Sequence, residues 1–264
     1  MGRIIAVVNQ KGGVGKTTTA VNLAASLAAA GRPTLLVDCD PQGNATSGLG
    51  LELAPEQPTI YQVLIGQARA DQAVNPTELE HLHLLGSNVE LFGAEVELAQ
   101  APDRQFLLAR QLELVAHQYD FIFLDCPPSL GLLTLNALSA CQGVLIPLQA
   151  EYYALEGLTQ LLHTVTRVRR RWNRRLNLEG IVITMFDGRN NLARQVAEDV
   201  RSHFGRLVYQ TVIPRNVRLS EAPSHGRPVI LYDPRCPGAK AYLALAREVM
   251  AGPRISPGQE EAAA

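Results

Sequence analysis

Residues 9–18 read Asn-Gln-Lys-Gly-Gly-Val-Gly-Lys-Thr-Thr, a stretch whose residue types suit the binding of a phosphate. Glycines let backbone N–H groups converge on an anion, and a helix that begins there adds its partial positive charge. Lys16 can reach the β- and γ-phosphates of a nucleotide, and the Thr17 hydroxyl can ligate Mg²⁺. The common pattern G-x-x-x-x-G-K-[ST] is not fully met, because Gln10 stands at its first glycine and a second lysine, Lys11, follows.

A phosphate loop needs a strand before it and a helix after it, and the flanking sequence predicts both. The apolar run 4–8 is typical of a buried strand, and the alanine-rich run 20–30 is typical of a helix. The alternative is a glycine-rich turn that binds nothing. The agreement of strand, loop and helix with one mechanism favours the phosphate loop.

Carboxylates follow two further predicted strands. Asp38 and Asp40 come after the apolar run 34–37, and Asp125 ends the run 121–125. Open α/β sheets bind ligands at the carboxyl ends of their strands, and a magnesium nucleotide needs carboxylates to order the waters on the metal. We therefore expect Asp125 to hold a Mg²⁺-bound water. A turn built from aspartate, proline and glycine is the alternative for each of these segments.

Strands alternate with helices along the rest of the chain, and the strands are too apolar to have a solvated face. This pattern predicts an α/β fold with one doubly wound, mostly parallel sheet covered by helices on both sides. We expect one domain over residues 1–252 and a disordered tail over residues 253–264. The expected strands lie at 81–86, 144–147, 181–185 and 208–213, and the expected helices at 59–65, 89–99, 104–118, 132–140, 154–175, 192–204 and 242–250.

The formal net charge of −1 hides an asymmetry between two parts of the chain. Residues 1–160 carry 7 Lys and Arg against 16 Asp and Glu, whereas residues 161–264 carry 17 against 9. Such a split suggests either a face for a polyanion or two ordinary solvated surfaces. Six arginines gather within 167–175, where they either complement the dipole of a helix end or contact DNA.

Two classes of protein are disfavoured by the composition. No apolar run approaches the roughly twenty residues of a membrane span, and no leader with a cleavage site opens the sequence, so we expect a cytoplasmic protein. The four cysteines are far apart and have no C-x-x-C spacing. We expect reduced, buried thiols rather than a metal or iron–sulfur site.

The double-lysine loop K-G-G-x-G-K-T-T resembles the deviant Walker A loop of the ParA/MinD/nitrogenase iron protein group of P-loop ATPases. Three further segments are similar to motifs of the chromosome-partition ATPases of that group, called ParA or Soj. They are the D-x-D-P-Q-G-N motif at 38–44, the D-x-P-P-S motif at 125–129 and the long motif P-R-N-V-R-L-S-E-A-P-S at 214–224.

The resemblance implies ATP and Mg²⁺ as cofactors and assigns roles to individual residues. Lys11, Lys16 and Asp40 would be catalytic, with Asp40 positioning the attacking water. Thr17 would ligate the metal, and Asp38 and Asp125 would act on it through water. Arg189 and Arg218 would contact DNA phosphates. The expected nucleotide contacts are Lys11, Gly12, Gly13, Val14, Gly15, Lys16, Thr17, Thr18 and, beside the adenine, Pro214 and Asn216.

The function that the resemblance implies is ATP-dependent partition of a chromosome or plasmid on the nucleoid. ATP would join two subunits in a sandwich in which Lys11 reaches the partner's ATP, and the homodimer would bind double-stranded DNA without reading its sequence. A centromere-binding partner of the ParB or Spo0J type would stimulate hydrolysis and release the DNA.

Two other functions remain open at this point. A MinD-like ATPase would bind membranes through a basic amphipathic C-terminal helix, but the tail here has two prolines after Gly252 and two glutamates, so we expect no membrane partner. A metabolic enzyme of the same group, such as a dethiobiotin synthetase or a ligase, would need an acceptor site, and the sequence has no recognisable motif for one.

Overall fold

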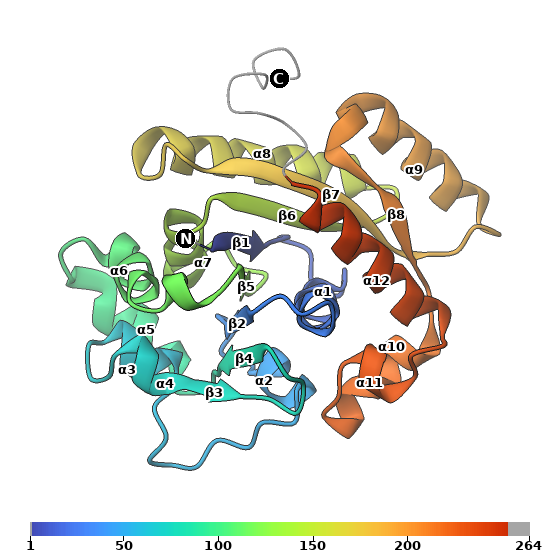
Figure 1. Cartoon of the computed structure of the whole chain (residues 1–264). Helices are drawn as coiled ribbons and strands as arrows, with labels where there is room; N and C mark the ends of the chain where they lie inside the picture. The colour runs from blue at the N-terminus through green and yellow to red at the C-terminus, as the bar shows by residue number, and fades with distance from the viewer. Residues whose placement is uncertain (1, 253–264) are drawn as a thin grey trace.

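The computed structural model describes residues 2–252, and its centre is one eight-stranded sheet (Figure 1). The strand order is β3-β4-β2-β5-β1-β6-β7-β8, and every neighbouring pair is parallel except β3 with β4 at one edge. The expectation of a mostly parallel α/β sheet is thereby confirmed. The strands are β1 (Arg3–Val7), β2 (Thr34–Asp38), β3 (Val74–Pro76), β4 (Leu82–Leu85), β5 (Phe121–Asp125), β6 (Gly143–Gln149), β7 (Asn177–Phe186) and β8 (Val208–Pro214).

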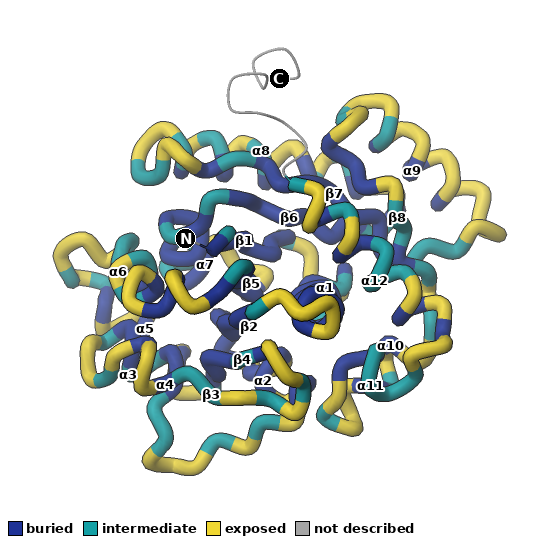
Figure 2. Tube along the Cα trace, in the orientation of Figure 1, coloured by how far each residue is buried: buried dark blue, intermediate teal, exposed yellow. Residues whose placement is uncertain are grey.

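Helices cover both faces of the sheet, so the central strands are buried on both sides (Figure 2). In β1, Ile4 and Ala6 join the core on one face, and Ile5 and Val7 join the core on the other. This alternation follows from the two-residue period of a strand and explains why the strand sequences are apolar throughout.

One face of the sheet is covered by α1 and α12 with the shorter α2, α10 and α11, and the other by α3 to α9. The helices are α1 (Lys16–Ala29), α2 (Asn44–Gly48), α3 (Ile60–Leu64), α4 (Ala70–Ala73), α5 (Leu91–Glu97), α6 (Leu107–Glu113), α7 (Leu132–Ala140), α8 (Ala154–Arg171), α9 (Asn191–Phe204), α10 (Val217–Glu221), α11 (Val229–Tyr232) and α12 (Pro237–Met250).

The expected helix at 104–118 is broken, which corrects the sequence-based prediction. Its α-helical part is α6, with short 3₁₀ turns on either side. The side chain of Asn136 on α7 accepts a hydrogen bond from the Leu108 backbone N–H at 3.1 Å and donates one to the Arg104 carbonyl at 2.8 Å. These bonds satisfy backbone groups at the start of the helix, where the 3₁₀ turn passes into α6, and the break itself is the turn at 114–115 that follows Glu113.

The expected helix at 154–175 ends four residues early, at Arg171. The Trp172 and Asn173 backbone N–H groups both donate to the Val168 carbonyl, at 2.8 and 3.1 Å, and close the last turn. The Asn173 side chain donates to the Leu138 and Cys141 carbonyls of the α7 end, at 2.9 and 2.6 Å. These contacts turn the chain toward α7, so the arginines after Trp172 lie in a turn.

Two helices begin at least four residues earlier than the sequence predicts. α1 begins at Lys16, and its first turn therefore belongs to the phosphate loop itself. α12 begins at Pro237, where the fixed φ of proline suits a first helical residue, and the Cys236 sulfur accepts a hydrogen bond from the Ala239 N–H.

All four cysteines are buried and unpaired in the structure, which confirms the expectation of reduced thiols.

Gly180 makes the close approach of β7 to Tyr209 possible, so Gly180→Ala should destabilise the fold. A Cβ at this position would lie 2.4 Å from Tyr209 Cε2 and 3.1 Å from the Leu207 carbonyl oxygen, and Tyr209 is fully buried. We expect a loss of about 1–3 kcal/mol in the free energy of unfolding, measured by urea denaturation. The control is Gly157→Ala on α8, where a Cβ meets nothing within 4 Å; it should stabilise by about 0.5–1 kcal/mol.

Candidate active site

The loop between β1 and α1 places unpaired backbone N–H groups at the carboxyl edge of the sheet. Gly13 and Gly15 have φ angles of 74° and 84°, a left-handed conformation that side chains disfavour. Gly15 is the N-cap of α1 and has no side chain to bond the first-turn N–H groups. Those donors and the positive end of the helix are therefore available to an anion.

Hydrogen bonds to the neighbouring strands β6 and β7 hold this loop in place. The Asn9 side-chain NH₂ group donates to the Pro147 carbonyl at 2.8 Å. The Asn9 side-chain oxygen accepts from the Lys11 N–H at 3.0 Å. The Thr184 hydroxyl on β7 donates to the Val14 carbonyl at 2.8 Å. The loop is thus fixed on both sides before any ligand binds, as phosphate recognition by backbone groups requires.

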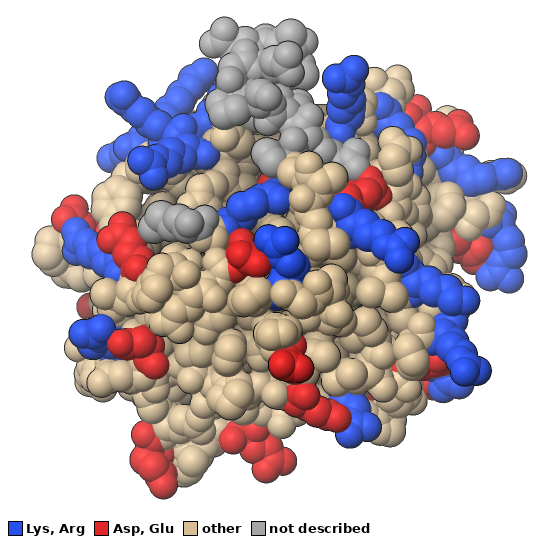
Figure 3. Space-filling view, viewed as in Figure 1, with Lys and Arg blue, Asp and Glu red and all other residues tan. Residues whose placement is uncertain are grey.

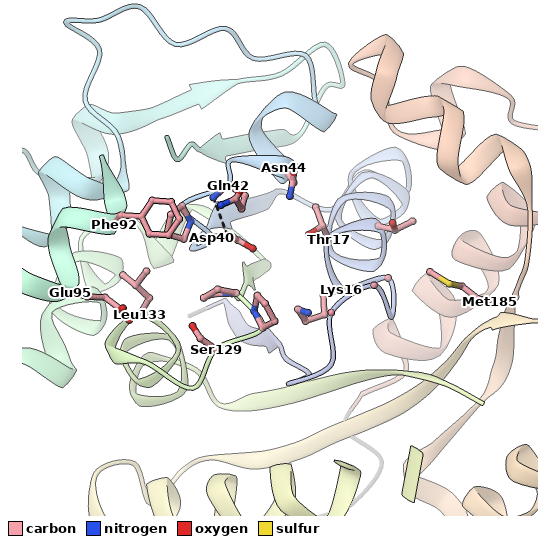
Figure 4. Close-up of a pocket in the computed structure, with 17 residues that line it drawn as sticks. Lys16, Thr17, Asp40, Gln42, Asn44, Phe92, Glu95, Ser129, Leu133 and Met185 are labelled. Atoms are coloured by element: carbon pink, nitrogen blue, oxygen red, sulfur yellow. Dashed lines mark hydrogen bonds between the residues drawn. The ribbon is translucent and has the colours of Figure 1, made fainter. Parts of the chain in front are cut away.

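A cleft opens above the loop, and we call it the loop cleft (Figure 4). Its lining comes from the loop, from the segments that follow β2 and β5, and from α5, α7 and the end of β7. It is lined by Gly12, Gly13, Gly15, Lys16, Thr17, Thr18, Asp40, Pro41, Gln42, Asn44, Phe92, Glu95, Pro127, Pro128, Ser129, Leu133 and Met185.

The two lysines of the loop have different surroundings. Lys16 lines the loop cleft and is buried, and its ammonium donates to the Lys11 carbonyl at 3.2 Å. Burial lowers the pKa of Lys16, and the carboxylates of Asp125 and Asp40 act in the opposite direction. Lys11 is about half exposed, and its ammonium pairs with Glu151, which follows β6. Lys16 is therefore buried in the lining of the loop cleft, whereas the half-exposed Lys11 is not part of that lining.

Asp125 is completely buried, and neither carboxylate oxygen has a hydrogen bond of ordinary geometry among residues 2–252, although the Thr17 hydroxyl lies near enough to lower the pKa of this carboxyl. Burial raises the pKa of Asp125 well above its usual range, and the neighbouring Asp38 adds to this effect, while the Thr17 hydroxyl and Lys16 oppose it. A carboxylate with two unsatisfied oxygens near a threonine hydroxyl suits a hydrated Mg²⁺, which prefers oxygen ligands. The residues here therefore fit a magnesium nucleotide.

Asp38 differs from Asp125, although the two are register neighbours on β2 and β5. One oxygen of Asp38 accepts from the Thr46 N–H and hydroxyl at 2.9 and 2.7 Å, and the other accepts from the Asp40 N–H at 3.2 Å. Burial raises the pKa of Asp38 to about 6, against these hydrogen bonds. Asp38 thus fixes the segment from Asp40 to Thr46, and Asp40 itself lines the loop cleft.

A second cleft adjoins the first and contains both residues expected near an adenine. We call it the β8 cleft. Pro214 ends β8, and Asn216 caps α10, where its side-chain oxygen accepts from the Arg218 N–H at 3.1 Å. Both clefts share Gly15, Thr18 and Met185. The lining is Gly15, Thr18, Thr184, Met185, Ile213, Pro214, Arg215, Asn216, Val217, Leu219, Ser220, Pro223 and Tyr242.

The two arginines expected to contact DNA lie outside these clefts. Arg189 is 91 % exposed in the turn after β7 and pairs with Asp187 at 2.7 Å. Arg218, on α10, pairs with Glu221 at 2.8 Å and with Asp233 at 3.4 Å. Each arginine is thus ion-paired, but its exposed guanidinium has further N–H donors for another anion.

Several lining residues were not expected from the sequence. Phe92 and Glu95 come from α5, and Met185 comes from the end of β7, where its φ of 50° is left-handed. Glu151 reaches Lys11 from the segment after β6. No motif marks these four residues, because their position depends on how distant strands and helices assemble.

Comparison with known proteins places the chain in a family. Residues 2–178 match a family model described as an AAA domain. The Bacillus subtilis sporulation initiation inhibitor protein Soj is 57 % identical over 251 residues, which cover 95 % of this chain and 99 % of that protein. The chromosome-partitioning ATPase Soj of Thermus thermophilus is 54 % identical over 94 % of this chain and 96 % of its own length. The chain belongs to the Soj/ParA family of chromosome-partitioning ATPases.

Solved structures of related proteins agree with the fold of this Soj/ParA-family chain. The Mycobacterium smegmatis cobyrinic acid a,c-diamide synthase, solved with an ATP analogue and magnesium, is 37 % identical over 95 % of both chains, with a TM-score of 0.82. The Pyrococcus furiosus cell division ATPase MinD is 29 % identical over 95 % of this chain and 99 % of its own, with a TM-score of 0.80. The expectation of a P-loop ATPase is confirmed.

Proposed function

We propose that this Soj/ParA-family ATPase segregates DNA through a nucleotide-controlled homodimer. ATP and Mg²⁺ are its cofactors. The loop cleft receives the phosphates, and the β8 cleft receives the base beside Pro214 and Asn216. The ATP-bound dimer binds double-stranded DNA without reading its sequence, and hydrolysis releases it.

Each expected site residue has a role in this proposal. Gly12, Gly13, Val14 and Gly15 offer backbone N–H groups to the phosphates, while Thr18 lines both clefts. Lys16 neutralises phosphate charge within its own subunit, and Lys11 leaves Glu151 to reach the partner's nucleotide. Thr17 ligates Mg²⁺, and Asp125 holds the metal through water. Asp40 positions the attacking water, and Asp38 supports the metal's hydration shell through the segment that it fixes.

The observation that carries the proposal is that Arg218 directly follows, in the sequence, two residues that line the β8 cleft. Asn216 and Val217 line the cleft, and Arg218 is the next residue, on the same short helix. Arg189 follows β7 in the same way, four residues after the cleft-lining Met185. Binding of a nucleotide in the cleft therefore acts on the two segments that carry the arginines.

Three further parts of the proposal concern partners and place. A ParB- or Spo0J-type centromere-binding protein stimulates hydrolysis. The protein acts in the cytoplasm, on the nucleoid. Residues 1–252 form one ATPase domain, since all eight strands join one sheet, and the proposed disordered tail, 253–264, lies outside the described residues.

Membrane binding of the MinD type is the second candidate. Of the helices described between residues 2 and 252, none is long and apolar enough to cross a bilayer. Flotation with anionic liposomes and ATP tests for peripheral binding, and recovery of the protein with the liposomes would replace DNA by a membrane as the partner. A metabolic role predicts instead that phosphate release depends on a small acceptor and is indifferent to DNA.

The test of the proposed function is binding to a plain DNA duplex with ATP, with ADP and without nucleotide, over a range of salt. We expect ATP to strengthen binding and salt to weaken it steeply, with each phosphate contact contributing about 0.9 to the logarithmic salt slope. Arg218→Ala should reduce both the affinity for DNA with ATP and the steepness of its dependence on salt. Arg227→Ala is the matched control, because Arg227 is also exposed and ion-paired, with Glu78. Equal affinity with and without ATP would contradict the proposal.

Glu151→Gln should make dimerisation easier, because it releases Lys11 from its partner in the monomer. An exposed ion pair contributes about 0–1 kcal/mol, so the ATP concentration needed for half-maximal dimer should fall by up to about five-fold. Size-exclusion chromatography with light scattering measures this. The control is Glu156→Gln, on the first turn of α8. It removes one negative charge but leaves the pair of Lys11 and Glu151 intact, so the ATP concentration for half-maximal dimer should not change. A higher ATP requirement in Glu151→Gln would argue that Glu151 assists the dimer.

A further inference from the structure

We propose that five arginines at the end of α8 form a second contact surface for the phosphates of duplex DNA, separate from Arg189 and Arg218. The choice of DNA as the polyanion rests on the proposed function, whereas the surface itself rests on the structure. We call it the α8 arginine cluster. It consists of Arg167, Arg170, Arg171, Arg174 and Arg175.

The cluster is a concentration of positive charge without neutralising carboxylates. None of its five guanidinium groups has a carboxylate within ion-pair distance among residues 2–252. Arg171 stacks over the Trp172 ring at 4.8 Å. Figure 3 shows Lys and Arg side chains gathered at the upper left, over the end of α8. By contrast, Arg189 and Arg218 both have carboxylate partners.

Stabilisation of the helix does not account for so many arginines. A cation in the last turn gains about 0.3–1 kcal/mol from the helix dipole, but the effect is confined to that turn. Arg167 lies before the last turn, and Arg174 and Arg175 lie beyond the helix. Like charges three and four residues apart, such as Arg167 with Arg170 and Arg171, destabilise a helix by about 0.2–0.5 kcal/mol a pair. The cluster therefore carries a local cost that an external anion would remove.

The shape and chemistry of the surface favour DNA over a lipid bilayer. A shallow groove runs along the helix, lined by His163, Thr166, Arg167, Arg170 and Arg171. None of the large apolar side chains that the structure exposes lies between residues 154 and 191. A peripheral membrane helix needs such side chains to enter the interface, whereas contact with a phosphate backbone needs cations and hydrogen-bond donors alone.

The cluster lies at the opposite edge of the sheet from the nucleotide clefts. α8 ends just before the start of β7 at Asn177, and Arg189 follows the end of β7 at Phe186. Ten strand residues at about 3.3 Å each place the two edges about 30 Å apart. No cleft-lining residue belongs to the cluster. The cluster should therefore bind DNA weakly in every nucleotide state, while the contacts of Arg189 and Arg218 are gained with ATP and lost on hydrolysis.

The experiment compares the full-length protein with the triple variant Arg167→Gln/Arg170→Gln/Arg171→Gln. In the absence of nucleotide and at low salt, we expect weak binding to a plain duplex that the triple variant loses. With ATP, the triple variant should keep nucleotide-dependent binding, but its logarithmic salt slope should fall by about 2–3, or about 0.9 for each lost contact. Binding measured by fluorescence anisotropy gives both quantities, and basal ATP hydrolysis should be unchanged.

Two control variants separate the cluster from general charge and from folding. Arg32→Gln/Arg69→Gln/Arg110→Gln removes the same charge from exposed arginines that pair with Asp120, Asp71 and Asp103, and it should bind nucleotide-free DNA like the unaltered protein. The triple Arg→Lys variant of Arg167, Arg170 and Arg171 keeps the charge and should retain binding. This second variant also shows whether the residues tolerate substitution without loss of the fold.

The outcomes distinguish this inference from the proposed function. One outcome is that Arg218→Ala loses ATP-dependent binding to DNA while the glutamine triple variant matches the unaltered protein at every salt concentration. In that case the partition proposal stands, and the proposal that the α8 arginine cluster binds DNA is refuted. If ATP has no effect on DNA binding but the triple variant abolishes it, the cluster stands and the partition proposal fails. Binding to anionic vesicles that the triple variant loses, with no binding to DNA, would assign the cluster to lipid instead.

Discussion

Asp125→Asn should stabilise the nucleotide-free protein while abolishing its Mg²⁺-dependent ATPase activity. The Asp125 carboxylate is completely buried, lies in register with Asp38 and has no hydrogen bond of ordinary geometry among the described residues. Asparagine has nearly the same shape but no charge, so it removes the repulsion between the two carboxylates and replaces the penalty of a buried charge by the smaller penalty of a neutral amide. We expect a gain of about 1–3 kcal/mol in the free energy of unfolding.

The activity of Asp125→Asn should change in the opposite direction. The bare carboxylate is suited to hold a water on the metal, and a neutral amide offers one oxygen without charge. We expect ATP hydrolysis to fall by at least about 100-fold, as for the loss of other fixed electrostatic groups. A thermal melt without nucleotide and a phosphate-release assay give the two results. Each kcal/mol should raise the melting temperature by about 2–4 °C.

Asp120→Asn is the control for this prediction. Asp120 is an exposed carboxylate paired with Arg32 at 2.8 Å, and such pairs contribute about 0–1 kcal/mol. Loss of the Asp120 charge should leave ATP hydrolysis unchanged. An Asp125→Asn protein that is less stable than the parent, or that still hydrolyses ATP at the parent rate, would show that Asp125 has a structural role and that the metal is held elsewhere.

Lys16→Ala and Lys11→Ala should fail at different steps, although the two lysines belong to the same loop. Lys16 is buried in the loop cleft, so its removal should weaken the binding of ATP to the monomer. The loss of a hydrogen bond to a charged group, about 1.5–3 kcal/mol, corresponds to about 10–150-fold in the dissociation constant. Lys11 is half-exposed, is not part of the cleft lining and pairs with Glu151, so Lys11→Ala should leave the monomer's affinity for ADP within about two-fold.

Titration calorimetry with ADP and ATP, combined with light scattering, separates these two failures. Lys16→Ala should show weak binding of both nucleotides, whereas Lys11→Ala should bind ADP normally and remain a monomer with ATP. Urea denaturation is the control for folding, and Lys11→Ala should lie within about 0.5 kcal/mol of the parent because its ion pair is exposed. Equal loss of ADP affinity in both variants would refute the division of roles between the lysines.

Much of the fold could be predicted from the sequence, because its signals are local. The apolar runs of β1, β2 and β5 are buried on both faces, so they read as strands without alternation. α7 has the predicted bounds, and the helix predicted at 59–65 is α3, which lies one residue inside them at each end because Thr59 is its N-cap and Ile65 its C-cap. The errors occurred where tertiary contacts override a local pattern. A turn at 114–115 divides the helix predicted at 104–118, and α8 ends early where the Asn173 side chain bonds to the α7 end.

The edge strand β3 shows a different limit. It is three residues long and pairs antiparallel with β4, and it includes a proline, which edge strands tolerate. A segment so short has no periodicity of its own. Its strand geometry depends on the neighbouring β4, and this neighbour is defined by the sheet rather than by the local sequence.

The phosphate loop, the carboxylates at the strand ends and the motif at 214–224 could be predicted from the sequence, because each depends on spacing within a short segment. The differences among those residues depend on the tertiary structure. Among the described residues, both oxygens of Asp38 accept hydrogen bonds of ordinary geometry while those of Asp125 accept none, and Lys11 pairs with Glu151, 140 residues away. The tertiary structure also puts the α8 arginine cluster at the sheet edge opposite the clefts. Desolvation, ion pairing and distance depend on the assembly of remote elements, so no local pattern can encode them.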